Sequence, residues 1–553
     1  MNTIKTKRLI SALLALTLLC AAMLSGCTAR SDAPAAANPA AQNTAPEQTN
    51  GSAPVETGSA PVAEVLRYAI NGRQLQDFDL GFLQIEDKQE NVVYSPLSVK
   101  YALGMLNEGT GGESHRQIAN LIGEYVPKIY PNSANLSLAN AMFIRDSYEA
   151  NVKQTYLQTL TQKYGADVFY DSFAGADKIN SWVEEKTLGL IKNLAQDSDV
   201  TPLDFALVNA LAIDMEWEQK FLGRIEGFEY PHEKFWLSVA SNVMKARFAG
   251  MDEEISGMEI VASVNNYDVV NELGADAIRQ TVGDAFDEYM KENPYSWYLE
   301  GEGTYEEKKE AYLDQYLKEI GTNYHRAEAS TDFSLYVDDE FKALAKDLKE
   351  YDGVTLRYVA IMPQDGDLAD WLKNANAAQI NDTISKLKEI RSENFPEGVV
   401  TKIVGFIPKF RFDYSLDLMN DLAGMGVTDV FDSGKADLSG ITEGPAYIGK
   451  ALHKANIEFT QDGIKASAAT MLGGAGAGSD FDYFYDVPVE EIDMTFDKPF
   501  VFFVQDKDTG EVWFAGTVYQ PLLLSEEPEA QGENANWMQE YSYQDYPWSG
   551  NLD

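Results

Sequence analysis

Hydrolytic chemistry would need a nucleophile with a nearby base, or a bound metal ion, and the histidines are the first residues to test. A Ser-His-Asp arrangement would have to use one of four: His115, His232, His325 or His453. None stands in a recognisable catalytic motif, and the sequence holds no Gly-x-Ser-x-Gly, His-Glu-x-x-His, Walker or dinucleotide-binding pattern. The aspartates at 365–370 and 480–482 lack the spacing of a calcium loop. We therefore expect no catalytic residue, no metal site and no cofactor, and the chain is not expected to be an enzyme.

A different chemistry is indicated at Cys27. Basic residues at positions 5, 7 and 8 precede an apolar run over 9–24, which is the order of an export signal. The run ends in the sequence LSGC and resembles a bacterial lipobox, where the peptide is cut before the cysteine and the cysteine receives acyl chains. This resemblance implies a signal peptide over 1–26 and a lipid on Cys27 that anchors the protein to the outer face of a bacterial membrane. A plain secretory signal is the alternative.

The other cysteine, Cys20, would leave with the signal. The mature chain would then have no disulfide and no thiol nucleophile.

Composition limits the partners. The chain has 553 residues, 45% of them hydrophobic, which is enough for a large core. Its 44 basic and 87 acidic residues give a formal charge of −43, which argues against nucleic acid or an anionic membrane surface as a partner. The sequence shows no coiled coil or internal repeat, so we expect a monomer.

Four regions follow one another along the exported chain. Residues 27–61 are rich in Ala, Pro, Asn, Thr, Ser and Gly, which predicts a disordered tether. A folded domain is expected over 62–521, with an acidic insertion at about 222–330; residues 251–330 alone hold 19 acidic and 6 basic residues. Residues 522–553 form an acidic, aromatic tail.

The folded domain mixes helix and strand patterns. A helix should begin at Ser95, as its cap, and end near Gly109. Apolar spacing predicts a second helix over 179–194, and a Thr304–Glu307 capping box predicts a third over 304–320. Alternation over 410–414 predicts a half-buried strand. The apolar runs 499–505 and 511–519 predict a buried hairpin.

The segment 463–478 consists almost wholly of small residues. Read with the two-residue period of a strand, one uncharged face carries Ile464, Ala466, Ala468, Thr470 and Leu472, and the other carries Lys465, Ser467, Ala469 and Met471. Glycine and alanine then continue to Gly478, after which the first face would carry Asp480 and Asp482. The pattern predicts a segment that can enter a sheet as far as about Gly478.

Five stretches together resemble the serpins, the suicide-type protease inhibitors. They are 91–98 (NVVYSPLS), 111–118 (GGESHRQI), 179–183 (INSWV), 207–210 (LVNA) with Trp217, and 500–504 (FVFFV) with Gly516. They occur in serpin order within residues 64–521. The resemblance implies an α+β, serpin-like fold of large, mostly antiparallel sheets surrounded by helices, with an exposed reactive-centre loop.

The resemblance also assigns roles to individual residues. Ser95, Ser98, Asn209 and His453 fall on the polar cluster, the shutter, beneath the opening of the main sheet, and Trp217 falls at the top of that sheet, the breach. The hinge of the reactive loop would comprise Gly463, Ile464, Lys465, Ala466, Ser467, Ala468, Ala469 and Thr470. In serpins a serine protease attacks the loop and forms an acyl-enzyme, after which the cut loop inserts into the sheet and disables the protease.

Spacing from the hinge, as in typical serpins, puts the scissile bond at Ala477–Gly478. A small alanine there suits the pocket of an elastase- or subtilisin-like enzyme. The absence of Lys or Arg between Lys465 and Lys498 argues against a trypsin-like target. An aromatic residue at 481 or 483–485 would instead offer a chymotrypsin-like site.

Three features depart from the serpin pattern. Gln461 replaces the usual hinge glutamate and removes a possible ion pair, Ile464 is bulkier than usual, and residues 222–330 are longer than usual. The acidic insertion could be a docking surface or simply a solvated helical insertion. A non-inhibitory serpin-fold surface binding protein is therefore the alternative function, and a lipoprotein hydrolase ranks third.

Overall fold

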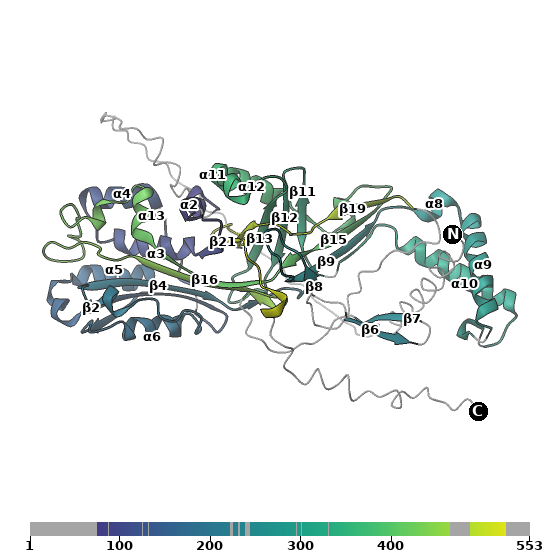
Figure 1. Cartoon of the computed structure of the whole chain (residues 1–553), viewed down its shortest axis with the longest axis horizontal. Helices are drawn as coiled ribbons and strands as arrows, with labels where there is room; N and C mark the ends of the chain where they lie inside the picture. Colours follow the sequence, from purple (N-terminus) through teal and green to yellow (C-terminus); the bar gives the residue numbers. More distant parts are fainter. Residues whose placement is uncertain are drawn as a thin grey trace, which may run out of the picture.

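The computed structural model describes residues 74–526, apart from 222–224, 231–232, 238–243, 465–486 and the single positions 87, 124, 131, 295, 300 and 330. Within this part the chain is an α+β fold in which helices cover large, mainly antiparallel sheets (Figure 1). The expected start of the domain at residue 62 lies outside the described residues, as do Cys27, the tether and most of the tail.

Two sheets make up the half of the molecule nearest the acidic insertion. The first is seven-stranded, in the order β1 (Val92–Tyr94), β21 (Val512–Val518), β20 (Phe500–Asp506), β13 (Leu356–Pro363), β12 (Phe341–Asp347), β11 (Ser334–Val337) and β14 (Lys388–Glu389). The second has the order β10 (Arg326–Ala329), β9 (Ile255–Asn265), β15 (Val400–Pro408) and β19 (Val489–Asp493), with β8 (Met244–Ala246) also on β9. A separate hairpin joins β6 (Ile225–Tyr230) to β7 (Glu233–Leu237).

Two further sheets lie edge to edge in the other half. One has the order β16 (Phe410–Asp417), β17 (Leu452–Phe459), β18 (Gly463–Ile464) and β5 (Met215–Glu216), and the other has β3 (Asp167–Asp171), β2 (Leu136–Arg145) and β4 (Phe205–Ile213). Strand β4 of the second sheet continues directly into β5 of the first, so one stretch of chain belongs to both sheets.

Helices surround these sheets. They are α2 (Asp77–Glu86), α3 (Pro96–Asn107), α4 (Gly112–Ile122), α5 (Gln154–Tyr164), α6 (Asp177–Lys186), α7 (Asp197–Val200), α8 (Val269–Leu273), α9 (Ala275–Glu292), α10 (Tyr305–Thr322), α11 (Leu368–Asn374), α12 (Ala377–Ser385) and α13 (Leu418–Gly424). One continuous apolar cluster joins α2, α3 and the strands of four sheets.

Most of the elements expected from the sequence are confirmed. Helix α3 has Ser95 as its cap, with Ser95 Oγ accepting from the Ser98 N–H at 3.0 Å. Strand β16 alternates as predicted, and β20 and β21 pair as the expected buried antiparallel hairpin. Helix α10 begins with the Thr304–Glu307 capping box.

The helix expected over 179–194 is wrong in its length, because α6 ends at Lys186. Leu188 and Gly189 both have positive φ angles, 56° and 77°, which leave the helical path. Thr187 closes the end, since its hydroxyl donates to the Val183 carbonyl at 2.7 Å and accepts from the Ile191 N–H at 3.0 Å. The following apolar residues still pack on the same small core, which explains the helix-like spacing.

The helical part of the acidic insertion lies between Asn265 and Arg326, which are direct partners in the β9–β10 ladder. Helices α8, α9 and α10 therefore extend from one end of a sheet hairpin, and their apolar faces form a core of their own around Val282, Leu313 and Tyr316. They occupy one end of the molecule, far from β2 and α6 (Figure 1). The insertion is thus a small helical body attached to an otherwise continuous sheet.

Candidate functional site

The two sheets that share the β4–β5 strand path are joined at only one end in the described residues. There β18 pairs with β17 through Ile464 and Phe459, and with β5 through Ile464 and Met215. Beyond β18, β4 pairs only with β2, and β17 pairs only with β16. Among the described residues no ladder joins β4 to β17, although both strands run in the same region. We call this gap the slot: Leu207, Asn209 and Leu211 of β4 line one side, and Leu452, His453 and Ala455 of β17 line the other.

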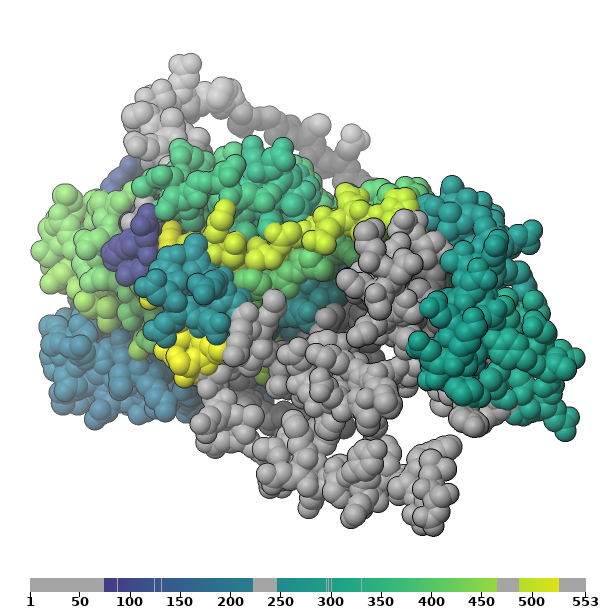
Figure 2. Space-filling view, turned by 45° about the vertical axis from the view of Figure 1, so that its right-hand side comes forward, coloured from purple at the N-terminus to yellow at the C-terminus, as the bar shows by residue number. Residues whose placement is uncertain are grey.

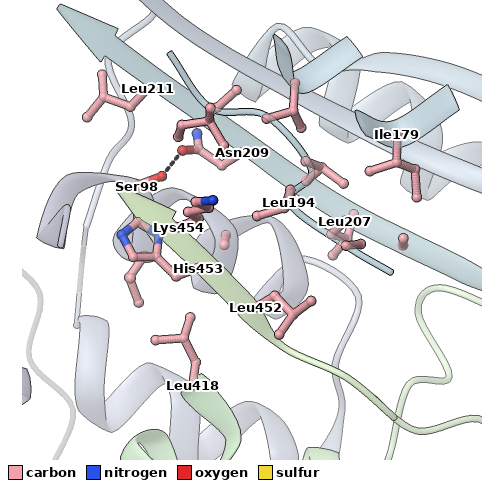
Figure 3. A pocket seen from close by; sticks show the side chains of 18 of the residues that line it. Ser98, Ile179, Leu194, Leu207, Asn209, Leu211, Leu418, Leu452, His453 and Lys454 are labelled. Carbon is pink, nitrogen blue, oxygen red and sulfur yellow. Dashed lines mark hydrogen bonds between the residues drawn. The ribbon is translucent and has the colours of Figure 1, made fainter. Parts of the chain in front are cut away.

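Cavities lie along the slot. One of about 110 Å³ is lined by β4, β17 and α3, and its residues are drawn in Figure 3. A second, of about 360 Å³, shares Leu207, Leu418 and Leu452 with the first and continues toward the far end of the slot. The lining is mostly aliphatic, so the slot is apolar with a few polar groups at its centre.

The uncharged polar side chains of the first cavity are the predicted shutter residues, and the structure brings all four together. Ser98 Oγ donates to Asn209 Oδ1 (Figure 3). The Ser95 N–H donates to His453 Nε2 at 2.9 Å. Asn209 also donates from Nδ2 to Asn140 Oδ1 at 2.8 Å. The sequence analysis missed Asn140, which is recognisable only from the register that places it opposite Asn209 in the β2–β4 ladder.

His453 is a neutral imidazole in this setting. It is 9% exposed, and burial lowers its pKa from 6.5 to about 4. Because Nε2 accepts the Ser95 N–H, the ring proton of the neutral form must be on Nδ1. The β17 side of the slot therefore carries a polar group without charge.

We expect the folded protein to lose stability on acidification because of His453. The pKa is lower in the folded state than in the unfolded state, so the stability contribution is present above pH 6.5 and is lost as the pH falls toward 4. The loss should be roughly 3 kcal/mol. Urea midpoints between pH 7 and 4 should fall less steeply in His453→Gln, whereas His115→Gln, at an exposed histidine, should follow the wild type. Parallel slopes for all three proteins would contradict the assignment.

Trp217 covers the joined end of the slot, as the breach position implies. Its backbone N–H donates to the Asp462 carbonyl at 3.0 Å and its Nε1–H to the Thr460 carbonyl at 2.8 Å. The ring contacts Phe459 edge to face, with centroids 5.3 Å apart. Trp217 thus holds the turn 460–462 that leads into the hinge.

Only the first two hinge residues, Gly463 and Ile464, lie among the described residues. A Cβ at Gly463 would stand 2.1 Å from the Met215 carbonyl oxygen, so only glycine fits against β5 there. Ile464 is 1% exposed and belongs to the main core, so its bulk is accommodated. The other hinge residues, from Lys465 to Thr470, and the predicted scissile residues Ala477 and Gly478 lie outside the described part.

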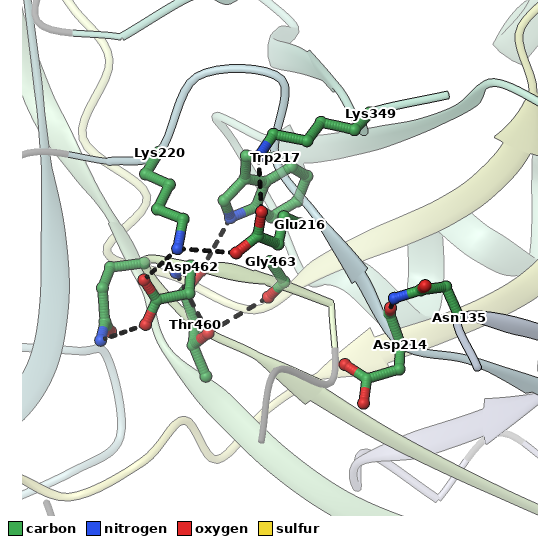
Figure 4. Close-up of polar contacts among 10 residues, drawn as sticks. Asn135, Asp214, Glu216, Trp217, Lys220, Lys349, Thr460, Asp462 and Gly463 are labelled. Carbon is green, nitrogen blue, oxygen red and sulfur yellow. Dashed lines mark hydrogen bonds and ion pairs between the residues drawn. The ribbon is translucent and has the colours of Figure 1, made fainter. Parts of the chain in front are cut away.

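Beside Gln461, which has no charge, the next residue makes an ion pair. Asp462 Oδ1 lies 3.1 Å from Lys220 Nζ, and its Oδ2 accepts from the Gln461 side-chain amide at 3.0 Å (Figure 4). The turn before Gly463 therefore carries one charged contact, at Asp462.

The chain returns from the undescribed segment on a different sheet. Val487 packs against the core of the acidic insertion, and β19 then pairs in parallel with β15. In the space-filling view β19 runs toward the block formed by α8, α9 and α10 (Figure 2). Residues 465–486 therefore connect the top of the slot to an edge strand beside the insertion.

The described residues contain no group of three His, Cys, Asp or Glu placed to hold a metal ion. Nor does any helix in residues 74–526, outside the gaps, combine the length and apolar character needed to cross a membrane.

Comparison with known proteins supports the architecture. The family described as Serpin (serine protease inhibitor) matches residues 80–244 and 290–521. Among curated relatives, an uncharacterized serpin-like protein of Methanosarcina acetivorans is 24% identical over 454 residues, 78% of this chain and 82% of the relative. Human Serpin B4 is 25% identical over 484 residues, which cover 80% of this chain and 97% of the relative. Leukocyte elastase inhibitor A of Rattus norvegicus is 24% identical over 452 residues, 78% and 93%.

Solved structures agree in fold. Thyroxine-binding globulin in complex with thyroxine matches with a TM-score of 0.52 at 17% identity, covering 80% of this chain and 98% of that one. Native protease nexin-1 with heparin matches with a TM-score of 0.51 at 18% identity, covering 83% and 99%. Because the family match spans well over half of the sequence, the chain belongs to the serpin family of protease inhibitors.

Proposed function

We propose that this protein is an irreversible suicide-substrate inhibitor of serine proteases of the elastase or subtilisin type. A protease would cut within residues 465–486, and the cut segment would enter the slot as a new strand. The observation that carries the proposal is β18: two residues of the hinge are already seated between β17 and β5, at the end of an unfilled slot that continues in the same direction.

Register supports the proposal. Ile464 is opposite Met215 and Phe459, and continuing both antiparallel ladders puts Ala466 opposite Ile213 and Ile457. Ala468 would follow opposite Leu211 and Ala455, and Thr470 opposite Asn209 and His453. Each of these β4 and β17 residues lies on the face that carries the buried Met215 and Phe459, so the uncharged face of the segment would meet the core.

Insertion would also give hydrogen-bond partners to both strand edges of the slot, which favours the inserted state. From Ile464 to Ala477, at roughly 3.3 Å per residue, the end of the segment would travel about 40 Å. That distance would carry an attached protease to the opposite end of the sheet.

Specificity follows from the sequence of the segment. Cleavage at Ala477–Gly478 fits an enzyme with a small specificity pocket. A site at the aromatic residues 481 or 483–485 would require Asp480 to be buried. We propose further that the protein is exported, cleaved before Cys27, and tethered by a lipid to the outer face of a bacterial membrane as a monomer.

The second candidate is a non-inhibitory serpin-fold binding protein. The two apolar cavities along the slot are the observation that favours it, since they leave space in the fold without an inserted strand. It predicts cleavage of the segment without trapping of the protease.

The test is incubation of a soluble form beginning at Thr28 with elastase, subtilisin, chymotrypsin and trypsin, followed by denaturing gels and mass spectrometry. We expect a covalent adduct with elastase or subtilisin and cleavage after Ala477. Cleavage by every enzyme with full retention of protease activity would exclude inhibition of these enzymes and favour the binding protein.

A further inference from the structure

Lys220 lies between two carboxylates at the joined end of the slot. Its Nζ is 2.9 Å from Glu216 Oε1 and 3.1 Å from Asp462 Oδ1 (Figure 4). Lys349 contacts the other oxygen of Glu216 at 2.5 Å. Hydrogen bonding from Lys349 and Lys220 holds the pKa of Glu216 below its usual range. The network therefore links two stretches of chain that are about 240 residues apart in sequence.

Those two stretches are the partners in the β5–β18 ladder. Glu216 is directly opposite Gly463, and Asp462 immediately precedes Gly463. The residues around Lys220 reinforce the link, because the Phe221 N–H donates to the Gln461 carbonyl at 3.1 Å. Gly463 and Glu216 are the first residue pair that an entering strand would make with β5. Lys220 joins the two sides of that pair through Asp462 and Glu216.

The position of the bridge makes its charge important. Without the Lys220 ammonium group, Asp462 would lose its cation, and Glu216 on the opposite strand would keep only Lys349. Gly463 has no side chain with which to hold β18 in place, and the β18 ladder is only two residues long. The charged contacts of Lys220 therefore add to the backbone contacts of Trp217 and Phe221 and to the burial of Ile464 in holding β18 against β5.

We infer that Lys220 is a positioning residue for insertion: in the uncut protein it holds β18 on β5, so that the entering strand already has its first pairs. This inference rests on the proposed function. Forming the first residue pairs of a strand costs conformational entropy, which only later pairs offset. A strand whose first pairs are preformed should therefore insert faster. Since insertion competes with hydrolysis of the acyl-enzyme, a slower start would release more active protease.

The first measurement is hydrogen exchange of the β18 amides in the uncut protein. In Lys220→Met we expect exchange to be faster by about threefold to tenfold, the range for losing two partly exposed ion pairs. Lys220→Arg should restore the wild-type rate, and Lys373→Met, which removes an exposed ion pair of α11, should not change it. Gly463→Ala provides a steric counterpart, because its methyl group would push β18 away from the Met215 carbonyl.

The second measurement is the number of inhibitor molecules consumed per trapped protease molecule. It should rise in Lys220→Met and Gly463→Ala, and stay at the wild-type value in Lys220→Arg and Lys373→Met. Added salt should raise this number in the wild type more than in Lys220→Met, because salt screens the ion pairs of Lys220 and the variant has none there.

The outcomes separate the two claims. Unchanged β18 exchange in Lys220→Met would overturn the inference whatever the protein inhibits. Faster exchange with an unchanged stoichiometry would overturn the positioning role alone. If the wild type traps no protease, the proposed function fails, and the positioning role fails with it. The exchange result would still show that Lys220 holds β18 on β5.

Discussion

On the proposed insertion mechanism, replacing Ala468 with lysine is expected to turn the protein into an ordinary protease substrate, with almost complete loss of the covalent protease complex. In the register set by Ile464 and Met215, residue 468 would lie between Leu211 and Ala455, which are 5% and 2% exposed. An unpaired ammonium group at such a position costs several kcal/mol, enough to stall insertion part of the way along the slot. The protease should cut the loop at the wild-type rate and then hydrolyse the acyl-enzyme. Gel assays for the adduct and for cleaved inhibitor measure both results.

The neighbouring residue supplies a matched control for this change. Residue 467 would face the other side of the new strand, between the half-buried Asn456 and the buried Ala212. Because that side also carries the native Lys465, Ser467→Lys should retain more of the complex than Ala468→Lys, although it introduces the same side chain one position away. Equal loss of the complex in both variants would contradict the register, and equal retention would contradict insertion itself.

Much of this site could be predicted from local sequence patterns. The Ser95 cap, the β16 alternation and the β20–β21 hairpin depend on nearby residues, and the structure confirms them. The grouping of Ser98, Asn209 and His453 could be predicted only from the family resemblance, since they are far apart in the sequence.

Other contacts could not be predicted because they depend on register between distant strands. Asn140 has no sequence feature that separates it from other strand residues until β2 is aligned with β4. The bridge from Lys220 to Asp462 likewise requires β18 to be aligned with β5. The early end of α6 depends on two positive φ angles, which apolar spacing does not reveal.

A buried lysine beneath Trp217 should make the stability of the protein rise with pH above neutrality. Lys346 of β12 is 1% exposed, with Nζ 4.8 Å from the Phe221 ring centre and 5.7 Å from that of Trp217. Nζ donates to the Asp332 carbonyl at 2.9 Å and to Thr331 Oγ1. Burial lowers the pKa of Lys346 from 10.5 to about 7, against the opposing effect of the Asp332 and Asp347 charges.

The sign of the effect follows from proton binding. Between pH 7 and 10.5 the unfolded chain holds a proton on this lysine that the folded protein has largely released, so unfolding becomes less favourable as the pH rises. From pH 7 to 9 the gain should be roughly 2 kcal/mol, measured as urea midpoints. The range stops at pH 9 because burial also raises the pKa of tyrosines such as Tyr94 and Tyr358, which act in the opposite direction above it.

Lys346→Met should remove most of this pH dependence while keeping an unbranched side chain against the two aromatic rings. The variant should exceed the wild type in stability at pH 7 by more than it does at pH 9. Lys342→Met, on the same strand but at a lysine 2.8 Å from Asp493, should keep the wild-type slope. A flat wild-type profile between pH 7 and 9 would mean that Lys346 keeps its proton in the folded protein. The end of the slot beneath Trp217 would then contain a buried cation, and opening it would release that charge to water.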